Sequence, residues 1–122
     1  LLTAWLKQLK NGEEIRCATD QIFCPTEIGD LVKALEVVLK KNLRGLYNIA
    51  SPEAFTRFDL ATKLKTQLEI KTGKISPCLI KDFNFLDNRS LNTSMDTSKF
   101  TKETGFKFST MEMCIRKLRK FV

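Results

Sequence analysis

Residues 14–41 read EIRCATDQIFCPTEIGDLVKALEVVLKK, and the fold follows from the order of two patterns within them. Polar and apolar side chains alternate over residues 14–18, which predicts a short strand. Over residues 28–39 the apolar side chains recur at every third or fourth position, which predicts an amphipathic helix with Thr26 as its cap. Residues 20–26, between the two, are expected to form a loop. A strand that leads into a helix is typical of α/β proteins.

The flanking sequence continues this alternation in both directions. Helical spacing and capping residues predict four more helices, at residues 1–10, 56–68, 97–104 and 109–121. Short apolar runs predict two more strands, at residues 45–50 and 75–80. Capping pairs are expected at Thr56 with Asp59 and at Ser109 with Glu112. The fold class is therefore α/β, with about five helices, few short strands and some parallel pairing.

The expected sheet is too thin for the helices around it. Three short strands cannot cover the apolar faces of the helices at residues 1–10 and 27–41. We therefore expect a partner domain outside residues 1–122. We also expect the chain alone to expose apolar surface and to associate.

Composition excludes several classes of site. The chain has 122 residues, a net charge of +7 and no histidine. It therefore cannot build a catalytic His, a Ser-His-Asp triad or a His-bearing zinc site. The positive charge favours anionic partners, but it does not choose among nucleic acid, membrane surfaces and phosphorylated metabolites.

The cysteines and the apolar runs indicate a compartment. Four cysteines form no Cys-x-x-Cys pair, which predicts buried free thiols in a reducing environment. No apolar run approaches the roughly 20 residues that a membrane span needs. The start at Leu1 shows neither an initiator Met nor a charged leader. We therefore expect a cytoplasmic, truncated chain with no membrane partner.

Four segments carry a resemblance to a known family. In chain order they are DQIFCPTEIGDLVKAL (20–35), GLYNIASPEAFTRFDLATKL (45–64), NRSLNTSMDTSKF (88–100) and GFKFSTMEMCIRKL (105–118). Together they resemble the C-terminal portion of dTDP-4-dehydrorhamnose reductases and related sugar-nucleotide reductases of the extended short-chain dehydrogenase/reductase superfamily. The third segment is similar to that family's Arg-Pro-x-Asn signature, with Arg89 and Asn92 matched and Ser90 in place of the usual Pro.

The resemblance implies the C-terminal, substrate-binding portion of an NAD(P)-binding, Rossmann-type fold over residues 1–122. The parent protein would be an NADPH-preferring reductase of 4-keto-6-deoxy sugar nucleotides, as in rhamnose biosynthesis. NADPH or NADH would be bound mainly by an N-terminal domain that is missing from this chain. A homodimer is one assembly of the parent that the resemblance allows.

The residues themselves indicate no catalysis by this chain alone. Its five glycines are too far apart for a dinucleotide-binding turn. The family's reaction uses a Tyr with a Lys four positions later, whereas Tyr47 is the single tyrosine and Ser51 stands where that Lys would be. We therefore expect no catalytic, cofactor-binding or metal-binding residue here. The resemblance places that equipment upstream of Leu1.

Four residues are expected to bind the sugar nucleotide. The resemblance implies that Arg89 contacts the nucleotide diphosphate, since a guanidinium can bind phosphate oxygens bidentately; a solvated loop arginine is the alternative. Gln21 and Thr26 would offer hydrogen bonds to sugar hydroxyls, although a helix cap also explains Thr26. Asn92 would line the same pocket, or its side chain would only shape a turn. Arg57 is expected at a helix start for structural reasons.

Two other functions remain open from the sequence. One is a non-catalytic regulatory or interaction subunit with the same fold, like the regulatory subunit of methionine adenosyltransferase. The other is a basic nucleic-acid-binding module, which only the +7 charge supports. Basic and aromatic residues are not interleaved in a recognised motif, so we expect no nucleic-acid partner. Four phenylalanines are expected to pack in the core instead: Phe83, Phe85, Phe106 and Phe108.

Overall fold

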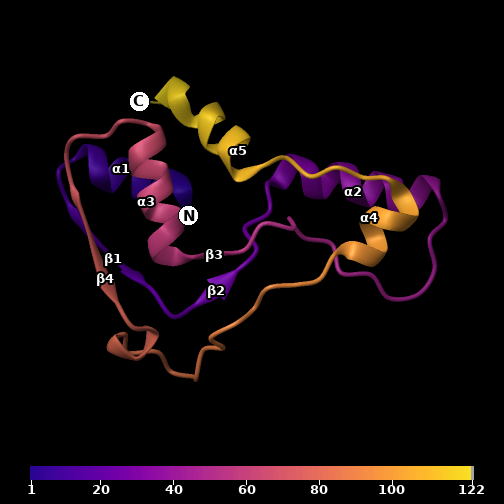
Figure 1. The fold of residues 1–122 in the computed structure, drawn as a ribbon, viewed down its shortest axis with the longest axis horizontal. Helices are drawn as coiled ribbons and strands as arrows, with labels where there is room; N and C mark the ends of the chain where they lie inside the picture. Colours follow the sequence, from indigo (N-terminus) through magenta and orange to yellow (C-terminus); the bar gives the residue numbers. More distant parts are fainter. Residues whose placement is uncertain (122) are drawn as a thin grey trace.

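The centre of the fold is a pair of parallel strands, β1 (Glu14–Ala18) and β4 (Lys74–Cys78), in the computed structural model, which describes residues 1–121 (Figure 1). Cys17 lies opposite Pro77 in the register. Pro77 has no N–H to donate, and it is tolerated because each strand of a two-stranded sheet has a free edge. The predicted α/β class and the parallel pairing are confirmed. The second of these strands begins and ends earlier than predicted.

Helices α1 (Leu2–Lys10) and α3 (Arg57–Gln67) pack against each other and against β1, and they form the main core. Six of their side chains are buried there: Trp5, Leu6, Leu9, Leu60, Ala61 and Leu64. The expectation that the first helix lacks a covering layer is therefore wrong. Apolar spacing identified the face that is buried, but the covering helix lies about fifty residues further along the chain.

The turn from α3 into β4 depends on Gly73. Its φ of 67° lies in the left-handed region. A Cβ at this position would stand 2.7 Å from the Cα of Leu9. The turn therefore passes α1 at a distance that only glycine permits.

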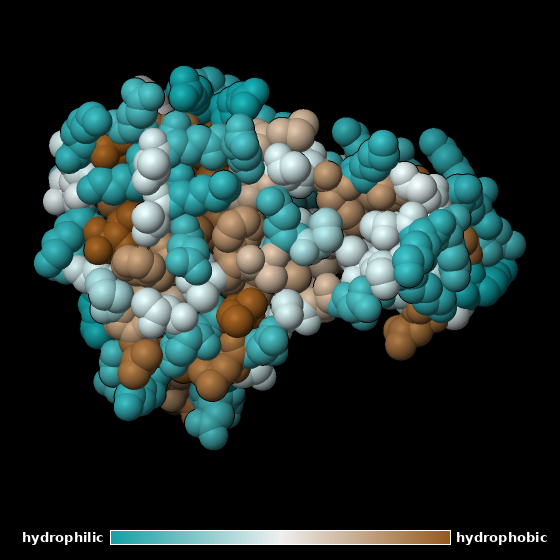
Figure 2. All heavy atoms as spheres, viewed as in Figure 1, coloured by the Kyte–Doolittle hydropathy of each residue, from teal (hydrophilic) through white to brown (hydrophobic). Residues whose placement is uncertain are grey.

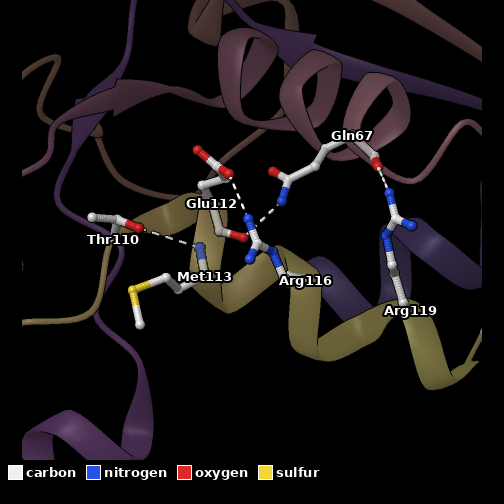
Figure 3. Close-up of polar contacts among 6 residues, drawn as sticks. All are labelled: Gln67, Thr110, Glu112, Met113, Arg116 and Arg119. Carbon is white, nitrogen blue, oxygen red and sulfur yellow. Dashed lines mark hydrogen bonds and ion pairs between the residues drawn. The ribbon is translucent and has the colours of Figure 1, made fainter.

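Helix α5 (Met111–Lys117), followed by the 3-10 turn η2 (Leu118–Phe121), is fastened to the end of α3 (Figure 3). The Gln67 amide nitrogen donates to the Glu112 carbonyl at 2.7 Å. The Arg119 guanidinium donates to the Gln67 carbonyl at 3.3 Å. These bonds hold the C-terminal helix beside the core.

Two capping predictions have opposite outcomes. Thr56 caps α3 and exchanges hydrogen bonds with Asp59, as expected. Ser109 does not cap α5, because the helix begins one residue later and Thr110 stands at the capping position. A shift of one residue changes which side chain reaches the free N–H groups of the first turn.

A second, narrower lobe contains α2 (Ile28–Lys40) and α4 (Ser98–Thr104) and extends away from the strand pair (Figures 1 and 2). Its centre is Phe100, which is fully buried. The rings of Phe106 and Phe108 lie 5.7 and 6.3 Å from it, so these two phenylalanines pack as expected.

Thr26 does not cap α2. Glu27 is the residue before the first helical one, and its carboxylate accepts a hydrogen bond from the Asp30 N–H at 3.0 Å. The Thr26 hydroxyl instead accepts a hydrogen bond from the Ser51 N–H at 2.9 Å. Thr26 therefore connects the start of α2 to the chain that follows this helix.

Residues 45–50, predicted as a strand, are irregular in structure. Side chains bond to their carbonyls: Lys99 donates to Leu46 and Thr97 donates to Asn48, each at 3.0 Å. A strand needs a neighbouring strand to satisfy its backbone, and none of the four described strands pairs with this segment. The prediction of a strand here is therefore wrong.

A short antiparallel pair joins the two lobes. Strand β2 (Ile22–Phe23) pairs with β3 (Phe55–Thr56) inside a stretch that was predicted to be a loop. The loop prediction is therefore wrong for these two residues. A strand of two residues is too short to show an alternating pattern, so periodicity could not detect it.

The apolar face of α2 has no cover within residues 1–121. Ile28 and Leu39 expose 70% and 79% of their surface, and Val32 and Leu35 are also exposed. The expectation of exposed apolar surface on this helix is confirmed.

All four cysteines are free thiols, as predicted, but only Cys17, Cys78 and Cys114 are buried; the expectation of burial is wrong for Cys24, which is half-buried. Burial raises the pKa of Cys17 to about 11, and it also raises the pKa of Cys78 and of Cys114. Among the helices of residues 1–121, none has the length and apolar character needed to cross a membrane.

Candidate functional site

A cavity of about 430 Å³ lies beyond the carboxyl ends of the parallel strands β1 and β4. Nine residues line it: Leu1, Trp5, Arg16, Gln21, Arg57, Ile80, Phe83, Phe85 and Arg89. They come from Leu1 and the helix α1 that follows it, from β1, from the start of α3 and from the segments that follow both strands. Open α/β folds bind ligands at this end of their strands. The cavity is therefore the candidate functional site.

Arg57 is held from two sides. It is the first residue of α3, so the cap at Thr56 sets where its backbone begins the helix. Its Nε donates to the Gln21 side-chain oxygen at 2.8 Å, and its guanidinium carbon lies 5.1 Å from the centre of the Phe23 ring. The Phe23 ring and the Gln21 oxygen together leave the Arg57 guanidinium little freedom to move.

Gln21 connects Arg57 to the segment that carries Arg89. Its side chain is 8% exposed, and both ends of its amide are used. The oxygen accepts from Arg57, while the nitrogen donates to the Ser90 carbonyl at 3.2 Å. A buried amide that satisfies both ends fixes the relative position of the two groups it joins.

Arg16 and Arg89 each stack on an aromatic ring of the wall. The guanidinium carbon of Arg89 lies 4.8 Å from the Phe85 ring centre, and that of Arg16 lies 5.4 Å from the Phe83 ring centre. The two rings are 5.8 Å apart, and Phe85 is 45% exposed. The expectation that these two phenylalanines pack in the core is therefore wrong, because the segment after β4 leaves the sheet and passes the cavity.

Three guanidinium groups line the cavity without an acidic partner. None of the nine lining residues is acidic. Within residues 1–121, no salt bridge joins Arg16, Arg57 or Arg89 to a carboxylate. Unneutralised guanidiniums raise the local potential, and each can bind two oxygens of one phosphate. The arrangement therefore fits a ligand that carries phosphate groups.

Of the four residues predicted from the sequence to bind a ligand, the structure brings Gln21 and Arg89 together at this cavity. Thr26 lies elsewhere, beside an apolar groove of about 520 Å³ between the starts of α1 and α2 and helix α5. Asn92 accepts hydrogen bonds from the Ser94 N–H and hydroxyl at 2.9 and 2.6 Å, which shapes the local turn. Neither of these two residues lines the arginine cavity.

Sequence reasoning did not select Arg16 and treated Arg57 as structural. Arg57 does begin a helix, but it also lines the cavity. The signal available in the sequence for Arg16 was its polar position between the apolar Ile15 and Cys17 in the predicted strand at residues 14–18. That signal does not separate a ligand contact from an ordinary solvated arginine.

Tyr47, the single tyrosine, belongs to the narrow lobe. Its hydroxyl donates to the Glu103 carboxylate, and this hydrogen bond raises the pKa of Tyr47. The Lys99 ammonium lies 4.2 Å from the centre of its ring. The three side chains form a local cluster that does not line the arginine cavity. In the described part of the chain, no group of three or more Cys, Asp or Glu residues could hold a metal ion.

One family model matches almost the whole chain. The family model described as RmlD substrate binding domain matches residues 1–120. No curated protein matches the chain.

Solved structures share the fold at low sequence identity. The dTDP-4-dehydrorhamnose reductase of Bacillus anthracis, in complex with NADP, matches with a TM-score of 0.84 at 20% identity over 100% of this chain and 43% of its own. The Clostridium acetobutylicum dTDP-4-dehydrorhamnose reductase matches with a TM-score of 0.85 at 16% identity over 99% of this chain and 43% of its own. The dTDP-glucose 4,6-dehydratase of Bacillus anthracis, in complex with NAD, matches with a TM-score of 0.72 at 16% identity over 98% of this chain and 39% of its own. The chain therefore spans less than half the length of these structures.

Proposed function

The chain belongs to the family of RmlD substrate-binding domains, and from this premise we propose that residues 1–122 bind a sugar nucleotide through its diphosphate. The observation that carries the proposal is the set of three guanidiniums around one cavity with no carboxylate among the lining residues. Arg57 and Arg89 would bind the phosphate oxygens. Gln21, which the sequence suggested as a ligand contact, lies between them.

The proposed role within the parent reductase is positioning. A bound diphosphate places the attached 4-keto-6-deoxy sugar at a fixed distance from the cavity wall, which makes its reaction effectively unimolecular. The proton donor and the hydride would come from groups outside these residues. The chain alone would be inactive as a reductase.

The residues present do not fit a nicotinamide dinucleotide. A dinucleotide pyrophosphate needs clustered glycines at a free helix N-terminus, whereas the glycines here are far apart in the sequence. At the start of α2 the Glu27 carboxylate already accepts the Asp30 N–H, and it stands 2.8 Å from the site of a Cβ on Gly29. We therefore assign NADPH or NADH, with NADPH preferred, mainly to a separate dinucleotide-binding domain.

The exposed face of α2 is the surface that this domain would cover. Relatives of the fold are more than twice as long as this chain. Four large apolar side chains on one helix face are uncovered within residues 1–121: Ile28, Val32, Leu35 and Leu39. Contiguous apolar surface of this kind marks an interface.

The test of the proposal is a titration of the isotopically labelled chain with dTDP. The NMR chemical shifts of the cavity residues report the binding. Arg57→Ala and Arg89→Ala should each weaken dTDP binding about tenfold or more. The reason is that a charge-assisted hydrogen bond contributes about 1.5–3 kcal/mol and 1.4 kcal/mol is tenfold in affinity. Thymidine, which has no phosphate, should not bind measurably.

Arg44→Ala is the matched control, since Arg44 is exposed and does not line the cavity. It should leave the dTDP affinity unchanged. If Arg57→Ala and Arg89→Ala behaved like Arg44→Ala, the cavity would not be the phosphate site. Single-stranded DNA that bound more tightly than dTDP, with a steep loss at high salt, would favour the nucleic-acid alternative.

A further inference from the structure

We infer that Gln21 is a positioning residue whose one amide aligns Arg57 and the segment carrying Arg89, so that both guanidiniums meet the same anion. The inference rests on the proposed function and deepens it. It assigns to Gln21 a role through its neighbours, distinct from the direct contact with sugar hydroxyls that the sequence suggested.

The first step is the orientation of Arg57. Gln21 accepts a hydrogen bond from Nε at 2.8 Å, which uses the inner edge of the guanidinium. The four N–H groups on the two terminal nitrogens remain to be donated. The guanidinium carbon also lies over the Phe23 ring, 5.1 Å from its centre, so the ring and the bond to Gln21 together restrict the direction of these donors.

The second step is the choice of an amide over a carboxylate. Glu at position 21 could accept the same Nε–H, but its negative charge would neutralise Arg57 and oppose an incoming phosphate. The Gln21 amide orients the cation and leaves its charge uncompensated. None of the lining residues restores a negative charge.

The third step concerns how residues 87–96, the segment that carries Arg89, are attached to the rest of the fold. All ten residues are exposed, so hydrogen bonds rather than burial hold the segment. Its backbone is anchored on β2 by the Ile22 N–H to the Leu91 carbonyl at 2.7 Å and by the Thr93 N–H to the Ile22 carbonyl at 2.9 Å. Both anchors follow Arg89 in the chain. They fix the middle of the segment and leave its N-terminal part to other contacts.

Gln21 supplies the contact next to Arg89. Its amide nitrogen donates to the carbonyl of Ser90, the adjacent residue. The oxygen of the same amide accepts the hydrogen bond from Arg57. Any displacement of the segment is therefore transmitted to both guanidiniums through one rigid, planar group.

The experiment compares Gln21→Met with Gln67→Met in the labelled chain. Gln21→Met keeps the length of the side chain and removes both hydrogen bonds. In the wild type the Arg57 Nε–H should give a distinct NMR signal protected from solvent exchange, and Gln21→Met should abolish that protection. Gln67 also donates to a backbone carbonyl but lies between α3 and α5 (Figure 3), so Gln67→Met should preserve the Arg57 signal and the dTDP affinity.

Affinity for dTDP distinguishes positioning from direct contact. Gln21→Met should weaken dTDP binding about tenfold. In combination with Arg57→Ala the further loss should be smaller than about tenfold, because the share of the Gln21 effect that acts through Arg57 is already gone and only the share through the Arg89 segment remains. Gln21→Glu should keep the protected Arg57 signal and still weaken dTDP binding, because its carboxylate neutralises the cation.

The outcomes separate the two proposals. If the wild type failed to bind dTDP, the proposed function would fail, and the inference with it. If the wild type bound dTDP but Gln21→Met kept the Arg57 signal, or if its loss of affinity were additive with Arg57→Ala, only the positioning role would be overturned.

Discussion

Helices α1 and α2 have similar amphipathic patterns and opposite environments. The apolar residues Leu6 and Leu9 of α1 are buried against the sheet and α3, whereas Ile28 and Leu39 of α2 are largely exposed. A repeating apolar face is a property of one helix, while its burial depends on what the rest of the molecule places opposite. The broad lobe around β1 and β4 has such a covering layer, whereas within residues 1–121 nothing covers this face of the narrow lobe.

The largest expected difference is in the free energy of unfolding. Leu9→Ala removes a fully buried side chain and should destabilise the chain by about 2–5 kcal/mol, the usual cost of a cavity in a core. Leu39→Ala changes a side chain that is 79% exposed and should cost less than about 0.5 kcal/mol. Urea unfolding of both variants measures the difference. Equal losses would contradict the contrast between the two helices.

A smaller difference is expected between two left-handed glycines, one in each lobe. Gly73 and Gly105 have φ values of 67° and 69°, so alanine adds about 1–2 kcal/mol of backbone strain at either. A Cβ on Gly73 would also meet the backbone of α1, whereas nothing lies within 4 Å of a Cβ on Gly105. Gly73→Ala should therefore cost about 1–3 kcal/mol more than Gly105→Ala. Similar unfolding midpoints for the two variants would mean that the turn can move away from α1.

The exposed face of α2 can be altered without cost to the fold. The double variant Ile28→Ser with Leu39→Ser should leave the unfolding free energy within about 0.5 kcal/mol of the wild type. It should reduce binding of an apolar dye. It should also weaken self-association, with a dissociation constant about ten times higher, because less apolar area is available for contact. Sedimentation and dye fluorescence measure both effects. Lys33→Ser, on an exposed position of the same helix, is the control and should change neither. Unchanged association of the double variant would exclude this face as the contact.

The smallest expected effect is a dependence on pH in the narrow lobe. The Asp96 carboxylate accepts the Ser98 N–H at 2.8 Å, and this hydrogen bond lowers the pKa of Asp96 below its ordinary 3.8. Because the folded-state pKa is the lower one, the stabilisation is present above pH 3.8 and is lost as the pH falls through the folded value. Asp96→Asn should therefore show a smaller loss of stability between about pH 4 and pH 2 in urea titrations.

Asp87→Asn is the matched control for this titration, since the Asp87 side chain is exposed and forms no salt bridge with the described residues. It should keep the wild-type pH dependence. An Asp96→Asn variant with the same pH profile as the wild type would show that the hydrogen bond to Ser98 does not contribute to acid stability.

The candidate site was only partly predictable. Arg89 was selected through its place in a family-like segment, and Gln21 through its loop, and these two line the cavity. Arg16 could not be selected, because an exposed arginine on a strand has the same local pattern whether or not a cavity lies beside it. Phe83 and Phe85 were misplaced in the core for the same reason: their apolar character is local, but the position of the segment that carries them is not.

The sequence by itself determined the parts of this protein that depend on near neighbours in the chain. Helices α1, α2 and α3, the strands β1 and β4, the Thr56 cap and the net positive charge follow from spacing, capping chemistry and composition over a few residues. Only the tertiary structure decided that, among the described residues, α1 is covered while the apolar face of α2 is not, and that residues 45–50 pair with none of the four strands. It alone joined Gln21 to Arg57, thirty-six positions away. The physical reason is that burial, strand pairing and a shared charge cluster are contacts between distant segments, which local periodicity does not record.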